Sequence, residues 1–420
     1  MNCARVLPMR AKRMLVLVAL LAGVGACGGK GTLSSSSASG SNVTGSAANV
    51  ATAVVNAGPS GDVNTLFTTV TVCAPGSTSN CQTIDNIEID TGSSGLRILA
   101  SALTANLPIQ TDGNGDSLAE CTQFVSSYSW GPVALADVTI AGETASSLPV
   151  QVIGDTNFAT VPAACASTGS EEDTVQAFGA NGILGIATEA QDCGAECASS
   201  STSGFYYACS SATNCLPITL GTASQLQNPV TYFAADNNGV IIELPSVSST
   251  GAESVTGALV FGIDTESNNA SSGTATILPV QVGTGYLTVS LNGTFYDQSF
   301  LDTGSNGYYF TDSSLTECTD ASAMGFYCPT STTSFTAIVC AYEDSGNCTG
   351  APQENISFSI GDADTLFSAN AAYTAFPTLG GSFPTGATVD LGLPFFFGRN
   401  VYEAFENKST SKGSGPYYAF

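Results

Sequence analysis

The tetrapeptide Asp-Thr-Gly-Ser occurs twice in this chain of 420 residues, at positions 90–93 and 302–305. An apolar stretch precedes each copy, and another follows it. Two carboxyl groups held within hydrogen-bonding distance do not both ionise cheaply, so Asp90 and Asp302 would share one proton if the fold brought them together. Such a pair can activate a water molecule and hydrolyse a peptide bond without a metal or a covalent intermediate.

The surroundings of both motifs resemble those of pepsin-like aspartic proteases. Segments 87–99 and 298–310 each run from apolar residues through DTGS to apolar residues, in the order of that family. Residues 181–186, Asn-Gly-Ile-Leu-Gly-Ile, match the family's motif of two apolar residues and a glycine. Val-Asp-Leu-Gly at 389–392 occupies the matching place in the second half, although Asp390 stands where the family has an apolar residue. Gly185 and Gly392 follow their aspartates at similar distances, which indicates an internal duplication.

This resemblance implies a mainly β, bilobal fold of the pepsin-like acid protease type, with two β-barrel-like lobes related by a pseudo-twofold axis. We expect the N-terminal lobe over residues 62–236 and the C-terminal lobe over 237–420. Abundant strand-forming residues and frequent turn signals independently favour a mainly β chain. The resemblance assigns catalysis to Asp90 and Asp302. It assigns supporting roles to hydroxyl groups and to glycines that permit close approach of the backbone. The supporting residues are Thr91, Gly92, Ser93, Thr303, Gly304 and Ser305.

The segment 124–131 resembles the strand and tip of the flap that closes over substrate in pepsin-like enzymes. Trp130 stands where that family usually has a tyrosine before glycine, and Tyr128 lies two residues earlier. An indole N–H can donate a hydrogen bond but cannot accept one, so Trp130 would reproduce only part of the role of a tyrosine. The alternative is an aromatic pair that packs in the core of a hairpin.

The N-terminus is typical of an exported lipoprotein. Residues 1–26 combine basic residues with a short apolar run, which indicates a signal peptide. The sequence Val-Gly-Ala-Cys that ends at Cys27 resembles a lipobox, so we expect Cys27 to be acylated and to anchor the chain. Residues 27–61 are rich in Ser, Ala and Gly and predict a flexible tether. We expect this lipid anchor to hold the protein in the cell envelope, in the outer membrane if the host has one, facing the periplasm or the surface.

Cysteine usage also favours export. Of 14 cysteines, Cys3 falls in the leader and Cys27 in the lipobox, which leaves an even number for disulfides. Local spacing predicts pairs 73–81, 121–165, 318–328 and 340–348, and two nested pairs among the remaining four. A zinc site at those four is a rival interpretation, but histidine and a second close cysteine pair are missing. The candidates are Cys73, Cys81, Cys121, Cys165, Cys193, Cys197, Cys209, Cys215, Cys318, Cys328, Cys340 and Cys348.

The charge and composition of the chain exclude some classes of binding partner and of catalytic site. The chain has 34 acidic and 9 basic residues and no histidine, and most of the basic residues lie near the N-terminus. Nucleic acid is therefore an unfavourable partner, and Ser-His-Asp or Cys-His catalysis is excluded. Residues 112–116 have the oxygen spacing of a calcium loop, although Gln123 replaces its last acidic ligand, and a solvated turn is the alternative. We expect a monomer that acts on a peptide or protein substrate and needs neither metal nor cofactor.

Three functions remain open at this point. The first is a lipid-anchored aspartic endopeptidase, in which Asp90 and Asp302 hold the attacking water. The second is a non-catalytic envelope lipoprotein on the same fold that binds a peptide or glycan; the departures at Trp130 and Asp390 favour it, whereas two intact DTGS motifs argue against it. The third is a structural envelope lipoprotein, which requires neither motif.

Overall fold

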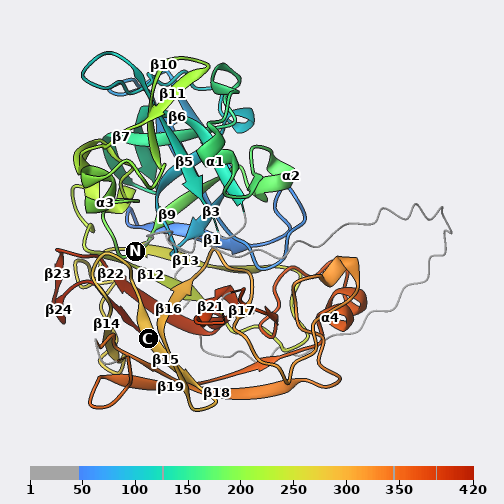
Figure 1. The fold of residues 1–420 in the computed structure, drawn as a ribbon. Coiled ribbons are helices and arrows are strands. Elements are labelled where there is room, and N and C mark those ends of the chain that lie inside the picture. The colour runs from blue at the N-terminus through green and yellow to red at the C-terminus, as the bar shows by residue number, and fades with distance from the viewer. Residues whose placement is uncertain (1–46, 125–126, 344–345, 385) are drawn as a thin grey trace, which may run out of the picture.

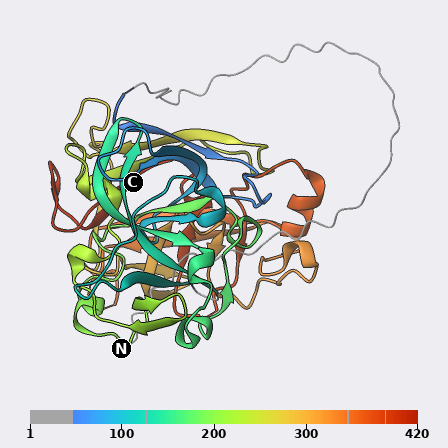
Figure 2. The ribbon, with the colours of Figure 1, turned by 90° about the horizontal axis from the view of Figure 1, so that it is seen from above.

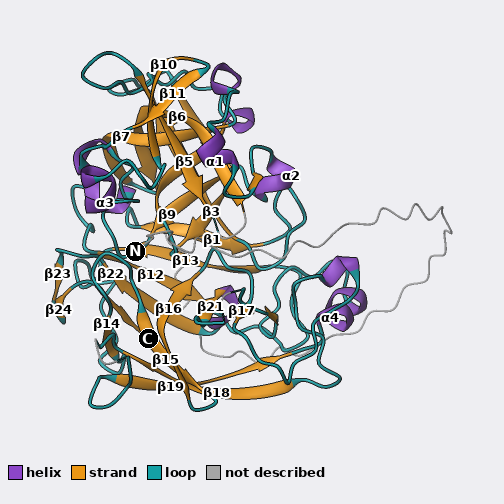
Figure 3. Ribbon diagram, in the orientation of Figure 1, coloured by secondary structure: helices purple, strands orange, loops and turns teal. Residues whose placement is uncertain are grey.

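The computed structural model describes residues 47–124, 127–343, 346–384 and 386–420. The predicted signal peptide, Cys27 and the first part of the predicted tether lie outside these residues. Strands dominate the described chain, which confirms the mainly β class, and the helices are short and lie around the strands (Figure 3). The α-helices are α1 (Ala163–Ala166), α2 (Val175–Phe178), α3 (Ala195–Ser199) and α4 (Ala363–Ala369). None of the described helices is long and apolar enough to cross a membrane.

The largest sheet has 16 strands and combines segments from both halves of the chain (Figure 1). Its order is β11-β10-β5-β6-β7-β4-β9-β3-β2-β1-β13-β12-β22-β25-β14, and β8 pairs with β6 outside that path. Its strands are β1 (Val50–Val55), β2 (Leu66–Cys73), β3 (Cys81–Asp90), β4 (Ser94–Leu99), β5 (Ser117–Gln123), β6 (Ser127–Ile140), β7 (Glu143–Ile153), β8 (Ser170–Glu171), β9 (Gly182–Ile186), β10 (Tyr206–Ser211), β11 (Asn214–Pro217), β12 (Gly239–Leu244), β13 (Val255–Phe261), β14 (Ile277–Pro279), β22 (Arg399–Ala404) and β25 (Tyr417–Ala419).

A second sheet of seven strands is built from the C-terminal half alone, in the order β19-β18-β15-β16-β21-β17-β20. A separate hairpin pairs β23 (Ser409–Thr410) with β24 (Gly413–Ser414). The strands of the seven-stranded sheet are β15 (Leu287–Leu291), β16 (Thr294–Asp302), β17 (Tyr308–Tyr309), β18 (Thr333–Cys340), β19 (Gln353–Ile360), β20 (Gly380–Gly381) and β21 (Asp390–Gly392).

The predicted tether is wrong for its last part, because β1 is a strand of the large sheet. Residues 50–55 pair with β13 along their whole length, and the two strands run side by side in Figure 2. Ala53 and Val55 are fully buried, so the Ala/Val alternation of this segment supplies apolar side chains to the core. The fold of the described residues therefore includes a strand that lies before residue 62.

The predicted boundary between residues 236 and 237 does not separate two sheets. Strands β12 and β13 follow it, yet β13 pairs with β1, which belongs to the N-terminal segment. The large sheet thus continues across the boundary, from β1 through β13 and β12 to β22. An interface of backbone hydrogen bonds joins the two halves.

Each half of the chain contains the same strand unit. In the first half, β3 runs parallel to β9, so that Asp90 lies opposite Gly185. In the second half, β16 runs parallel to β21, so that Asp302 lies opposite Gly392. The strand that follows each DTGS motif, β4 or β17, pairs antiparallel with the same partner, β9 or β21. This is the duplication that the spacing of the motifs predicts.

The hydrophobic core extends beneath both motifs. One cluster of buried residues contains Ile89 and Leu301, which precede the two aspartates, together with Leu184 and Leu391 from the paired strands. These residues are all 0% exposed. Close packing of this kind leaves the two motif loops little freedom to move relative to each other.

Six disulfides link the twelve cysteines of the described chain. Four of them confirm the predicted pairs 73–81, 121–165, 318–328 and 340–348. The prediction of two nested pairs is wrong, because Cys193 bonds Cys197 and Cys209 bonds Cys215. The second of these bonds joins cross-strand neighbours of the β10–β11 hairpin, which brings its cysteines together locally. Several disulfides in one chain indicate an oxidising, exported environment.

Candidate active site

Asp90 and Asp302 are the last residues of strands β3 and β16, and both are completely buried. Each carboxyl accepts a backbone N–H from the glycine two residues later, Gly92 or Gly304, at 2.8 Å. The other oxygen of each carboxyl accepts the hydroxyl of the serine three residues later. Ser93 contacts Asp90 in this way. Ser305 contacts Asp302 at 2.9 Å, so the two halves hold their carboxyls through the same pair of donors.

Thr91 and Thr303 tie the two motif loops together across the site. The backbone N–H of each threonine donates to the hydroxyl of the other, at 3.2 and 3.0 Å. The hydroxyl of Thr303 donates to the carbonyl of Ile89 at 2.7 Å, and that of Thr91 donates to the carbonyl of Leu301 at 3.3 Å. Each hydroxyl therefore bridges to the strand end that carries the opposite aspartate, and four hydrogen bonds fix the relative position of the loops.

Gly92 lies directly against the carboxyl of Asp302. A β-carbon added at Gly92 would be 2.8 Å from Cγ and Oδ1 of Asp302, which is closer than nonbonded atoms approach. Only glycine permits this contact, because any side chain would push the two loops apart. The first DTGS motif needs Gly92 for this reason, as the sequence predicts.

The surroundings of Asp302 favour the protonated form of its carboxyl. Burial raises the pKa of the Asp302 carboxyl well above its usual range, and the charges of Asp90 and Asp390 and a hydrogen bond with Asp90 act in the same direction. The hydroxyl of Ser305 opposes this shift by donating to the ionised form. Two buried carboxyls whose charges interact do not both ionise cheaply, and these effects favour the protonated form of Asp302.

The comparison with protein families gives a match that spans all of the described residues. Residues 45–420 match the model of a family described as "Protein of unknown function (DUF3443)". The chain belongs to the DUF3443 family. The match begins just before β1 and includes both DTGS motifs, so the strand that composition assigned to the tether is part of the family's common region. No curated protein matches the chain.

The aromatic pair of this DUF3443 member lies in the core of a hairpin. Trp130 is 2% exposed, and its Nε1–H donates to the carbonyl of Phe158 at 2.7 Å. The same cluster holds Tyr207, whose ring meets that of Trp130 edge to face, and the disulfide of Cys121 with Cys165. The expectation that Trp130 closes over a substrate is therefore wrong, because its one donor is engaged inside the protein.

Tyr128 has the same surroundings as Trp130, in the same buried cluster. It is 6% exposed and lies opposite Gln123 across the β5–β6 hairpin. Burial and the charge and hydrogen bond of Glu171 raise the pKa of its phenol. Residues 125 and 126, at the end of this hairpin, lie outside the described residues. The hairpin-core interpretation thus holds for both aromatic residues.

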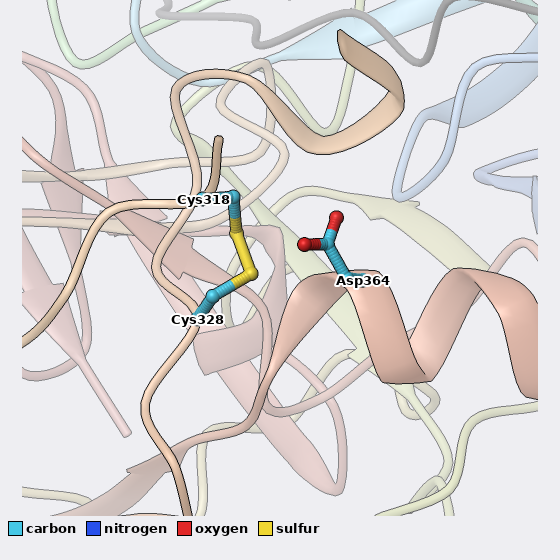
Figure 4. A group of neighbouring side chains, drawn as sticks. All are labelled: Cys318, Cys328 and Asp364. Atoms are coloured by element: carbon cyan, nitrogen blue, oxygen red, sulfur yellow. A yellow bond between two sulfur atoms is a disulfide. The ribbon is translucent and has the colours of Figure 1, made fainter. Parts of the chain in front are cut away.

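The described cysteines offer no thiolate for a metal. Cys318, Cys328 and Asp364 approach one another closely, but Figure 4 shows the two sulfur atoms bonded to each other beside the carboxyl of Asp364. The four cysteines proposed as a zinc alternative are likewise paired in disulfides. A disulfide sulfur cannot replace a thiolate ligand, so neither cluster fits zinc.

The candidate calcium loop forms a solvated turn. Asp112 accepts the backbone N–H groups of Asn114 and Asp116 at 2.8 and 2.9 Å, and it accepts the amide of Asn114 as well. Its oxygens are thus engaged by donors within the turn, whereas calcium requires them to converge as ligands. The turn interpretation accounts for this segment.

Two groups of buried acidic residues lie near the motifs, and sequence reasoning marked only Asp390 among them. Arg97, only 2% exposed, binds Glu120 at 2.6 Å and Asp192 at 3.1 Å, and this network joins β4 to the cysteine-rich segment that starts near residue 187. Asp390 and Glu403 are 1% and 0% exposed, and they lie near Ser305 and Thr91, respectively. The oddity of Asp390 within an apolar motif was the only sequence signal for these groups.

Proposed function

We propose that this DUF3443 protein is an aspartic endopeptidase with a bilobal, pepsin-like fold. The observation that carries the proposal is the symmetric arrangement of the two motif loops, with both carboxyls fully buried and held by matching donors. Chance occurrence of DTGS does not account for it, because the reciprocal threonine contacts require both loops at once.

The repeated strand unit supports the bilobal part of the proposal. Each half delivers its aspartate on a strand that runs parallel to a strand with a glycine opposite that aspartate. Those glycines, Gly185 and Gly392, lie against the backbone of the loop that follows the motif, where a β-carbon would collide with carbonyl oxygens. A pseudo-twofold axis between the threonines would relate the two lobes.

The proposed chemistry is hydrolysis by general acid–base catalysis. Asp90 takes one proton from a water molecule while the water oxygen attacks the peptide carbonyl carbon. In the same step, Asp302 gives its proton to the carbonyl oxygen. The resulting diol then collapses: a hydroxyl proton returns to Asp302, Asp90 protonates the amide nitrogen, and the C–N bond breaks. A carboxylic acid and an amine leave, and the pair again holds one proton.

Access to the site distinguishes this proposal from its rival. Both carboxyls are 0% exposed, and the cavity that borders Thr91 and Gly92 measures only about 20 Å³. A peptide can reach the pair only if the surrounding segments open. The burial of both carboxyls favours a second candidate, a non-catalytic envelope lipoprotein that binds a peptide or a glycan on the same fold.

The cellular setting in the proposal combines two observations. The disulfides fit an exported protein, and Cys27 in its lipobox-like sequence would carry the lipid that anchors the chain to a membrane of the envelope. We propose that a single protomer at this anchor, facing the periplasm or the cell surface, cleaves unfolded or extended peptide segments.

The test is an incubation of an unfolded protein substrate with the purified exported protein from about pH 3 to pH 7. Cleavage that is lost in Asp90→Ala and blocked by a transition-state mimic of the aspartic protease class would support the peptidase. An intact substrate at every pH, together with saturable binding of the same peptide, would support the binding protein instead.

A further inference from the structure

Residues 281–286 form a turn that covers the cavity beside the first motif. The turn connects β14 to β15, and its residues 284–286 border the cavity of about 20 Å³ together with Thr91 and Gly92. Gly92 lies directly against the carboxyl of Asp302. The turn therefore covers the approach to the candidate pair at this cavity.

The base of the turn packs against the N-terminal half through Gly285. This glycine is buried, and its φ is +65°. A β-carbon there would be 3.1 Å from Oγ1 of Thr188 and 3.4 Å from Oε1 of Glu189. A glycine suits both the left-handed backbone and the close contact. The two halves of the chain thus meet at this point, and their contact closes one edge of the cavity.

The turn is held together by its own hydrogen bonds. The N–H of Gln281 donates to the carbonyl of Tyr286 at 2.8 Å, and the N–H of Gly285 donates to the carbonyl of Gln281 at 2.9 Å. The hydroxyl of Thr284 donates to Oε1 of Gln281 at 2.7 Å. At the tip of the turn, Val282 is 68% exposed. The turn can therefore move as one body without breaking these hydrogen bonds.

Other walls of the cavity are anchored more firmly. The strands β16 and β25 are paired within their sheets, and the threonine contacts fix the motif loop. In the segment 187–189, the N–H of Ala187 donates to the carbonyl of Ser93 at 2.8 Å. The carbonyl of Glu189 accepts the hydroxyl of Ser94, also at 2.8 Å. Moving any of these walls breaks hydrogen bonds of the fold, so the turn is the wall that opens at the lowest cost.

The hydroxyl of Thr188 makes the closed contact less favourable. Thr188 is 1% exposed, and its Oγ1 has no hydrogen-bond partner in the part of the chain that the structure describes. A buried polar group of this kind loses its hydration and gains no hydrogen bond in return. When the turn moves away, water reaches this hydroxyl, which offsets part of the cost of opening.

We propose that residues 281–286 are a lid over the candidate pair, which opens by moving away from Thr188 and gives a peptide access to Gly92 and the carboxyls beside it. The lid belongs to the C-terminal half, whereas the flap expected from the sequence lies at 124–131, where the hairpin core encloses Trp130. The role of the lid in peptide entry rests on the proposed function, but its movement does not depend on that function.

Thiol labelling measures the opening whether or not the protein cleaves peptides. Thr188→Cys adds a thiol beneath the lid, and the reaction of the wild-type protein is subtracted so that only the new thiol is counted. Thr288→Cys, on β15, is the matched control, because Thr288 is 0% exposed and its hydroxyl likewise has no partner in the described residues. We expect a small thiol reagent to react at least about tenfold faster at position 188 than at position 288.

Gln281→Ala ties the labelling to the lid itself. The side chain of Gln281 accepts the hydroxyl of Thr284 within the turn and donates to the hydroxyl of Tyr342 outside it, at 2.8 Å. Its loss should loosen the lid, so the reaction of Thr188→Cys should become faster still, whereas that of Thr288→Cys should not change. Equal reaction rates at the two positions, or no effect of Gln281→Ala at position 188, would overturn the proposal.

A disulfide that holds the lid shut gives the second readout. The β-carbon position at Gly285 lies 3.1 Å from Oγ1 of Thr188, and in a disulfide a β-carbon lies about 3.0 Å from the partner sulfur. Thr188→Cys combined with Gly285→Cys should therefore form this bond, which mass spectrometry detects. If the protein hydrolyses peptides, kcat/KM of the bonded protein should be at least about tenfold below that of each single variant.

The two readouts separate the lid from the proposed function. A bonded protein that cleaves as fast as the single variants would overturn the lid while leaving the peptidase in place. Absence of any hydrolysis by the wild-type protein, together with the faster labelling of Thr188→Cys, would overturn the proposed function and leave the lid in place.

Discussion

Thr91 and Thr303 each donate a backbone N–H to the hydroxyl of the other, at 3.2 and 3.0 Å, although 212 positions separate them in the chain. Both are buried, at 1% and 0% exposure. A reciprocal pair of this kind makes each motif loop part of the support of the other. The candidate site therefore exists only when both halves of the chain are folded together.

The threonine bridge should be tested with Thr303→Val. The change removes the acceptor for the Thr91 N–H and the donor to the Ile89 carbonyl, both in the buried interior. We expect the free energy of unfolding, measured by urea denaturation, to fall by about 1–3 kcal/mol. Thr144→Val, on the exposed side of β7, is the control and should stay within about 0.5 kcal/mol of the wild type. Equal effects of the two changes would contradict the role of the bridge.

Gly92→Ala tests the close approach of the loops. The added methyl would meet the Asp302 carboxyl at 2.8 Å, so the loops must separate. We expect a loss of stability of about 1–3 kcal/mol and, if the protein is a peptidase, a loss of most of its activity. Gly113→Ala is the control, since nothing lies within 4 Å of its added carbon. A Gly92→Ala protein that is as stable and as active as Gly113→Ala would refute the predicted contact.

The buried acids predict that stability falls as pH rises. Burial raises the pKa of Asp302, Asp390 and Glu403 well above the usual range in the folded protein. Each keeps its proton after the unfolded chain has lost it near pH 4, so the stability present below about pH 4 is lost as pH rises toward the folded pKa.

The corresponding measurement is urea unfolding at a series of pH values from about 3.5 to 7.5. The free energy of unfolding should decrease by up to about 1.4 kcal/mol per pH unit for each proton that the folded state retains. Glu403→Gln should make this slope shallower. A stability that rises over the same range would show that these carboxyls are ionised in the folded protein.

The disulfide pattern of the cysteine-rich segment gives a covalent test of the fold. Digestion without reduction, followed by mass spectrometry, should yield the pairs 193–197 and 209–215. Recovery of the nested pairs 193–215 and 197–209 would place β10 and β11 differently from the structure, because Cys209 and Cys215 are cross-strand neighbours there.

The motif residues could be predicted from the sequence because their chemistry is local. Within each motif, the glycine N–H and the serine hydroxyl donate to the aspartate no more than three residues away, and the second copy repeats those contacts. The strand β1 also carries a local signal, an alternation of Val and Ala in residues 50–55. The small and polar residues around this strand have the composition of a flexible tether, and the tether prediction followed that composition. The pairing of β1 with β13 depends on a partner about 200 residues away.

The errors concern properties that only the tertiary structure determines. Trp130 has the right spacing for a flap, yet Phe158 and a disulfide enclose its ring. The burial of Glu403 has no signature in a strand that also contains Arg399 and Asn400. Asp390 was recognisable as unusual, but its relation to Ser305 depends on how β21 aligns with β16.

The central claim is that Asp90 and Asp302 together hydrolyse a peptide bond. The direct measurement compares kcat/KM for an unfolded substrate in acid between the wild type, Asp90→Asn, Asp302→Asn and Asp297→Asn. Asp297 lies on the same strand as Asp302 but is exposed, so its variant controls for the loss of one acid. The account predicts a loss of about 10³-fold or more in each pair variant and wild-type activity in Asp297→Asn. Equal activity in all four proteins, or none in the wild type, would contradict it.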